Sequence, residues 1–128
     1  PARRREYLFV SPAVSPLQSV RDSVFTSLLK PENRRVEPWA SSALAFLNDR
    51  MRQSEAIKYI RPALDELLEV QQTGDIFFPT SWLRSLLYAH TSSAARKEVE
   101  DFLLANPNYQ SFLKGKLLQQ AGHLLQSQ

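Results

Sequence analysis

Apolar residues recur three and four positions apart along almost the whole chain, and this spacing constrains the fold more than any other feature. Residues with such a spacing share one face of an α-helix, whereas a half-buried strand requires apolar residues at alternate positions. Between residues 17 and 29 the apolar face consists of Leu17, Val20, Val24, Phe25, Leu28 and Leu29. Only three glycines occur in 128 residues, and Leu, Ala, Gln, Glu, Arg and Ser are the common residue types, a composition that favours helices over sheets. The sequence predicts an all-α protein.

Proline, glycine and cap residues divide this pattern into about six predicted helices. Ser15 predicts the N-cap of the first helix, with Pro16 in its first turn, and the second helix is expected to begin near Pro38. In the third helix Pro62 predicts a kink or an interruption. Gly74 is expected to end that helix in the left-handed conformation.

The remaining three predicted helices follow the same logic. The fourth begins around residue 82 and runs to about residue 90, and the polar residues 91–93 supply caps for the fifth. A turn at Asn106-Pro107-Asn108 separates the fifth helix from the sixth, which extends over residues 109–124.

Short connections predict that neighbouring helices pack as antiparallel hairpins, three of which would stack as a short α-solenoid. No sequence repeat of fixed period is present, so this repetition would be structural only. We expect residues 1–10 to be a linker from a preceding domain and residues 11–128 to form a single helical domain. Because the chain opens with Pro1 rather than Met, we expect it to be a piece of a longer protein.

The sequence contains no constellation that predicts catalysis or metal binding. It has no cysteine, and its two histidines, His90 and His123, have no second histidine four positions away. The three glycines do not form a phosphate-binding loop, and no nucleophile elbow of the G-x-S-x-G type occurs. We therefore predict no catalytic, cofactor-binding or metal-binding residue in this chain.

The histidines and carboxylates are interpreted as structural. His90 is expected to cap backbone carbonyls or to pack its ring, and His123 to lie on the surface of the last helix. The acidic residues cluster at Asp65-Glu66-Glu69 and at Glu98-Glu100-Asp101, mostly beside the apolar positions, which is typical of a solvated helix face.

The charge balance predicts no nucleic-acid partner and no membrane span. The net charge is +3, and the one local excess, Arg3-Arg4-Arg5, is interpreted as a solvated end of the linker. No apolar run approaches the ~18 residues that a membrane-spanning helix needs. The sequence is compatible with a cytoplasmic protein and with a periplasmic or secreted one.

The apolar connection at residues 74–82 has two interpretations. Its Ile76, Phe77 and Phe78 either fill the gap between two hairpins or form a surface that docks onto another domain. For the second interpretation, the candidate interface residues are Tyr7, Phe77, Phe78 and Trp82.

Several stretches resemble the helical C-terminal domain of M1-family zinc aminopeptidases, most closely that of bacterial members. They are residues 28–34 (LLKPENR), residues 37–39 (EPW), residues 72–82 (QTGDIFFPTSW), residues 90–92 (HTS) and residues 114–119 (KGKLLQ). The similarity runs from about Phe9 to the end of the chain, and the TGDIFFP stretch is its most specific part.

The resemblance implies a parent enzyme that removes N-terminal residues from peptides with one zinc ion. In that family the zinc ligands and the general base lie in an upstream catalytic domain, in an HExxH motif that these 128 residues lack. The C-terminal domain is a HEAT-like or armadillo-like stack of helices that helps enclose the substrate cavity. The implied partners are therefore the upstream catalytic domain of the same polypeptide and a peptide substrate in the assembled cavity.

Two other hypotheses remain open. The chain is alternatively a free-standing helical module that binds a protein or peptide through its concave face. A nucleic-acid binder that uses Arg3 to Arg5 together with Arg34, Arg35, Arg50 and Arg52 is the least favoured hypothesis. It would show a steep salt dependence of DNA or RNA binding, and we predict no binding at physiological salt.

Overall fold

The computed structural model describes residues 1–126, and this part of the chain is all-helical, with no strand. It contains nine α-helices and three single-turn 3-10 helices. In chain order the elements are α1 (Ala2–Val10), η1 (Ser11–Val14), α2 (Gln18–Leu28), η2 (Pro31–Asn33), α3 (Glu37–Leu47), η3 (Arg50–Arg52), α4 (Gln53–Asp65), α5 (Leu67–Thr73), α6 (Phe78–Leu87), α7 (Ser93–Ala105), α8 (Ser111–Gln120) and α9 (Gly122–Leu125).

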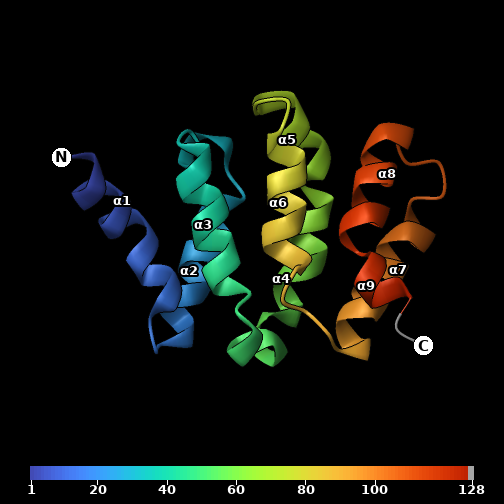
Figure 1. Ribbon diagram of the computed structural model, residues 1–128, viewed down its shortest axis with the longest axis horizontal. Coiled ribbons are helices and arrows are strands. Elements are labelled where there is room, and N and C mark those ends of the chain that lie inside the picture. Colours follow the sequence, from blue (N-terminus) through green and yellow to red (C-terminus); the bar gives the residue numbers. More distant parts are fainter. Residues whose placement is uncertain (127–128) are drawn as a thin grey trace.

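The longer helices lie side by side, and they follow one another along the long axis of the molecule, to which they are roughly perpendicular (Figure 1). Helices α1, α3, α6 and α8 contact one another in this order, and we call them the first row. Helices α2, α4 and α7 form a second row, in which α2 packs against α3, and α4 packs against α6 and α7. Helix α1 and the last described helix, α9, therefore lie at opposite ends of the molecule (Figure 1).

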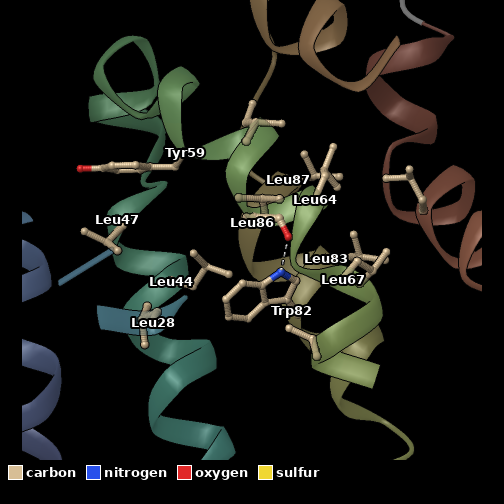
Figure 2. Packing of buried hydrophobic residues seen from close by; sticks show 14 of the residues in the cluster. Leu28, Leu44, Leu47, Tyr59, Leu64, Leu67, Trp82, Leu83, Leu86 and Leu87 are labelled. Atoms are coloured by element: carbon tan, nitrogen blue, oxygen red, sulfur yellow. Dashed lines mark hydrogen bonds between the residues drawn. The ribbon is translucent and has the colours of Figure 1, made fainter. Parts of the chain in front are cut away.

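One continuous hydrophobic core fills the space between the two rows. It extends from Ala13 at the start of the chain to Leu124 near its end. Leucines from helices of both rows meet in its centre, as Figure 2 shows for Leu44 of α3, Leu64 of α4 and Leu83 of α6. Helices α2 to α9 each bury apolar residues in this core, which is the arrangement that the spacing of apolar residues predicts, whereas α1 has no buried residue and packs against the core through the partly buried Phe9.

The all-α prediction is confirmed, but the helices are shorter and more numerous than expected. The third predicted helix is interrupted, as Pro62 led us to expect, although the break lies four residues later, at Glu66 between α4 and α5. The last predicted helix is also divided, because α8 ends at Gln120 and α9 begins at Gly122.

The predicted linker, residues 1–10, contains α1, which packs against α3. The Phe9 and Trp39 rings lie with their centroids 5.8 Å apart at this contact. Whether α1 also connects the chain to a preceding domain stays a prediction.

Of the predicted caps, one is confirmed and one is wrong. Ser92 caps α7, since its hydroxyl accepts a hydrogen bond from the Ala95 N–H. Ser15 does not cap α2, which begins at Gln18. The Ser15 carbonyl instead accepts hydrogen bonds from Arg21 Nη1 at 2.7 Å and from Arg52 Nη1 at 2.6 Å. These two arginines hold the backbone before α2 in an extended path.

Gly74 ends α5, but not in the predicted left-handed conformation. Its backbone is extended, with φ −107° and ψ 176°. A glycine is required there for a steric reason, because a Cβ atom would lie 2.6 Å from Phe78 Cδ2 and 2.8 Å from the Val70 carbonyl oxygen. The close approach of α6 to the end of α5 therefore explains this glycine.

Candidate interaction face

The structure separates the four predicted interface residues into two pairs. Tyr7 and Phe77 are exposed, with 67% and 75% of their surfaces accessible. Phe78 and Trp82 are buried, with 3% and 0% accessible. Phe78 and Trp82 therefore offer no surface to another domain in this structure, whereas for Tyr7 and Phe77 an interface role stays a prediction.

Trp82 lies between the two rows and contacts both of them. Its indole Nε1 donates a hydrogen bond of 3.1 Å to the Ala63 carbonyl oxygen in α4 (Figure 2). The guanidinium carbon of Arg34 lies 5.4 Å from the centre of the indole ring. A buried indole needs a partner for its single N–H, and the Ala63 carbonyl supplies it.

The turn between α5 and α6 resolves the two interpretations of the apolar connection. Phe78 fills a gap in the core, but Ile76 and Phe77 project into solvent, with 76% and 75% of their surfaces accessible. Two hydrogen bonds hold the turn: the Asp75 N–H donates to Glu37 Oε2 at 2.9 Å, and the Phe77 N–H donates to Asp75 Oδ1 at 2.7 Å. One of the three apolar side chains therefore acts as the predicted plug, and two do not.

Phe77 continues into a stripe of residues on the outer side of α6. The core-facing positions of this helix are Phe78, Pro79, Trp82, Leu83, Leu86 and Leu87. The positions opposite to them include Phe77, Arg84 and Tyr88, all of which are exposed. Their spacing of seven and four residues places them on one helix face, which points away from the core.

Two grooves flank α3 beside this stripe. The larger groove, of about 520 Å³, lies between α1, η1 and α3 and is lined by Tyr7, Val10, Val14 and Phe46 together with polar residues of α1 and η1. The smaller groove, of about 270 Å³, lies between α3 and α6 and is lined by Ala45, Arg84, Ser85, Tyr88 and Ala89. Each groove includes one residue of α3, Phe46 in the larger groove and Ala45 in the smaller one. We call the two grooves together with Phe77 the candidate interaction face.

The first row, which carries this face, has an excess of basic residues. Its four helices contain six basic residues and two acidic ones. None of the ion pairs within residues 1–126 involves a residue of these four helices. Arg84, at the centre of the face, therefore has no charged partner in the described part of the chain. The face combines exposed aromatic rings with three charged residues, Arg3, Glu6 and Arg84.

The second row differs in this respect. Its helices contain five basic and six acidic residues, and five of the six ion pairs in residues 1–126 join two of them. Arg21 of α2 bonds Glu55 of α4 at 3.0 Å, and Lys97 bonds Asp101 within α7 at 3.0 Å. Charges that are paired in this way are typical of a solvated surface.

The carboxylates of α5 only partly match the predicted solvated face. Glu69 receives hydrogen bonds of 2.6 Å from Arg34 Nη2, and its side chain is 29% exposed. Burial opposes its charge, but the hydrogen bonds from Arg34 and Thr73 outweigh this and hold the pKa of Glu69 below its ordinary value. Burial and the neighbouring Glu69 raise the pKa of Glu66. The Arg34–Glu69 pair joins the segment after η2 to α5.

Both histidines have structural roles, but capping of backbone carbonyls, one of the two roles expected of His90, belongs to His123. His90 is fully buried, and its Nε2 lies 2.8 Å from Asn48 Oδ1. His123 is exposed, and its Nε2 lies 3.1 Å from the Leu87 carbonyl oxygen and 3.0 Å from that of His90. His123 thus caps the carbonyl end of α6, a role that the sequence analysis assigned to His90 instead.

The described part of the chain contains no cluster of three or more metal-ligating side chains. Across the same residues, no helix combines the length and the apolar character that crossing a bilayer requires.

The sequence analysis missed Phe46, Arg84 and Tyr88 as members of the face. The sequence does contain a signal for them. Each is a large or charged residue at a position opposite or beside the buried positions of its own helix. They lie on the outer sides of the helices rather than in the loop before α6, and only the packing of α1, α3 and α6 brings these residues together.

Comparison of the chain with family models, with curated proteins and with solved structures gave no match.

Proposed function

We propose that this chain is the C-terminal accessory domain of an M1-type zinc metallo-aminopeptidase. In this proposal it is non-catalytic, its paired helices stack as a HEAT-like or armadillo-like solenoid, and it helps enclose the cavity in which the parent enzyme holds its peptide substrate. The parent would remove N-terminal residues from peptides.

The observation that carries the proposal is the asymmetry between the two rows. The second row pairs its charges with one another, as a surface in water does, whereas the first row leaves aromatic rings and Arg84 without partners. An uncovered apolar surface of this kind marks an interaction site. The sequence stretches that resemble the M1 family agree with an accessory domain that packs on a larger body.

A wall of packed helices suits this role. Helices that share one continuous core move together as a body, so they form a rigid surface that shifts only as a whole. Such a wall excludes bulky folded chains from a cavity and admits peptides, without contacting the bond that is cleaved. The zinc ion, its ligands and the general base belong to the upstream domain, and this chain supplies none of them.

The decisive experiment measures aminopeptidase activity in two preparations, this 128-residue chain and the complete polypeptide that contains it. We expect the complete polypeptide to hydrolyse aminoacyl-p-nitroanilide substrates and to lose that activity with a zinc chelator. We expect the isolated chain to show none. Peptide hydrolysis by the isolated chain that survives the chelator, and is abolished by substitution of one of its own side chains, would falsify the proposal.

The second candidate function is a free-standing helical module that binds a protein or peptide. The two grooves favour it, because they are complete within this chain and need no further domain to form. The sequence upstream of Pro1 discriminates between the two functions. An HExxH motif there supports the peptidase, and its absence supports the module.

A further inference from the structure

Helix α1 is the most weakly held α-helix in the described part of the chain. Residues 2–8 are exposed, Phe9 and Val10 are half-buried, and no residue of α1 is buried. Each of the other eight α-helices in residues 1–126 buries at least one residue. Few buried contacts are typical of a segment that opens locally while the rest of the protein stays folded.

One aromatic contact holds α1 on α3. The Phe9 and Trp39 rings lie with their centroids 5.8 Å apart and their planes inclined at 48°. Within residues 1–126, no hydrogen bond or ion pair joins α1 to another α-helix. The attachment of α1 therefore depends on apolar packing around Phe9.

The sequence of α1 forms a poor helix by itself. Its nine residues are fewer than the ~12–15 that an isolated helix needs in water. Arg3 and Arg4 lie in the first turn and Arg5 follows, beside the positive end of the helix dipole, where no acidic residue compensates them. The N-cap residue is Pro1, whose side chain makes no capping hydrogen bond. We therefore expect α1 to lose its helical structure when it leaves α3.

The position of α1 determines the surface at this end of the molecule. Seven residues line the larger groove, and four of them, Arg3, Glu6, Tyr7 and Val10, belong to α1. With α1 in place, the surface is a groove between α1, η1 and α3. Without α1 the groove no longer exists, and the side of α3 that carries Trp39 is uncovered.

We propose that α1 is a displaceable strap, which docks on α3 through Phe9 and Trp39 and detaches and unfolds while α2 to α9 remain folded. The docked strap forms the larger groove, and the detached strap removes it. Helices α2 to α9 do not need α1 to stay folded, because the cluster of buried residues begins at Ala13 and contains no residue of α1. This property holds whether or not the chain is part of a peptidase.

Backbone hydrogen exchange of the 128-residue chain, followed residue by residue by NMR, tests the proposal. The unaltered chain is compared with two variants. Phe9→Ala removes the contact with Trp39, and Leu8→Ala, the matched control, removes an apolar side chain of α1 that is 60% exposed. Acrylamide quenching of tryptophan fluorescence gives a second measurement. It reports on Trp39, because Trp82 is 0% exposed.

In the unaltered chain we expect the amides of α1 to exchange about 100-fold or more faster than those of α6, and about tenfold or more slower than in an unfolded peptide. Phe9→Ala should accelerate the exchange of α1 about fivefold or more and increase the quenching of Trp39. It should leave the exchange of α4, α6 and α7 unchanged. Leu8→Ala should change the exchange of α1 about twofold or less.

Four results would overturn the proposal. Exchange of α1 as slow as that of α6 would show that α1 belongs to the cooperative core. Exchange of α1 as fast as in an unfolded peptide would show that it does not dock. Equal effects of Phe9→Ala and Leu8→Ala would show that the contact with Trp39 does not hold α1. Faster exchange throughout α2 to α9 in Phe9→Ala would show that these helices depend on α1.

Discussion

At the scale of single residues, His90 shows how a buried polar side chain is held by a neighbouring helix. Asn48 Nδ2 donates to the Leu44 carbonyl oxygen at 2.9 Å, so its Oδ1 is free to accept from His90 Nε2 at 2.8 Å. The neutral ring therefore carries its proton on Nε2. His90 Nδ1 has no hydrogen-bond partner in the described part of the chain, so a second proton there would be buried without an acceptor.

This geometry predicts a pH dependence of folding. Burial, with a smaller contribution from the charge of His123, lowers the pKa of His90 from 6.5 to about 4. Between these pH values the unfolded chain binds more protons at this position than the folded chain, so stability falls as the pH falls. Above pH 6.5 the neutral His90 makes its full contribution to the free energy of unfolding. About 3 kcal/mol of this free energy is lost when the pH falls to 4.

Urea unfolding between pH 4 and 7 measures this effect, with His90→Gln as the comparison. Glutamine keeps an N–H donor for Asn48 but does not titrate, so the free energy of unfolding of the variant should depend less on pH in this window. Carboxylates with shifted pKa values act equally in both proteins. Parallel pH profiles for the two proteins would show that His90 is not the group that titrates.

Gly74 and Gly115 form a matched pair of substitutions. Gly74→Ala should lower the free energy of unfolding by about 1–3 kcal/mol, because the new Cβ atom collides with Phe78 and with the Val70 carbonyl. Gly115→Ala, within α8, meets no atom within 4 Å and should raise it by up to about 1 kcal/mol, since alanine favours a helix. Urea midpoints measure both, and a neutral Gly74→Ala would mean that α6 can move away from α5.

At the scale of elements, the Arg34–Glu69 pair holds together segments far apart in the chain. Arg34 is 3% exposed and also donates from Nη1 to the Leu28 carbonyl oxygen at 2.8 Å, so it links the end of α2 to α5. Its position against Trp82 extends this link to α6. A buried guanidinium needs a counter-charge, and Glu69 is the only carboxylate bonded to it in the described part of the chain.

Removing this counter-charge should destabilise the fold. Glu69→Gln leaves the Arg34 charge buried without its partner, and we expect a loss of about 2–4 kcal/mol in the free energy of unfolding. Asp101→Asn, which breaks the solvent-exposed pair with Lys97 in α7, is the control and should leave the urea midpoint unchanged. Equal shifts of the urea midpoint for the two variants would show that the Arg34–Glu69 pair contributes no more to stability than an exposed ion pair does.

At the scale of the whole molecule, the continuous core predicts a single unfolding transition. The buried cluster extends from η1 to α9 without a gap, so no group of helices has a core of its own. Unfolding in urea followed by tryptophan fluorescence, which reports on Trp39 and Trp82, should therefore coincide with unfolding followed by circular dichroism. Two separate transitions would show that the ends of the rows unfold independently, as in a longer solenoid.

The sequence alone determined the all-α class, because the apolar spacing of a helix is a local property of the chain. It also determined the start of α3 near Pro38, the cap at Ser92 and the interruption after Pro62, each of which depends on residues within a few positions. The absence of a catalytic or metal-ligating motif is likewise a property that can be read without coordinates.

The tertiary structure alone decided which side chains are buried and which share a surface. Phe77 and Phe78 are adjacent and chemically alike, yet one is exposed and the other lies in the core, because α6 begins between them. The start of α2 and the conformation of Gly74 were decided by contacts with residues distant in sequence or packed from another helix. The candidate interaction face has the same origin. Its residues come from three helices, and only the packing of those helices places them on one side of the molecule.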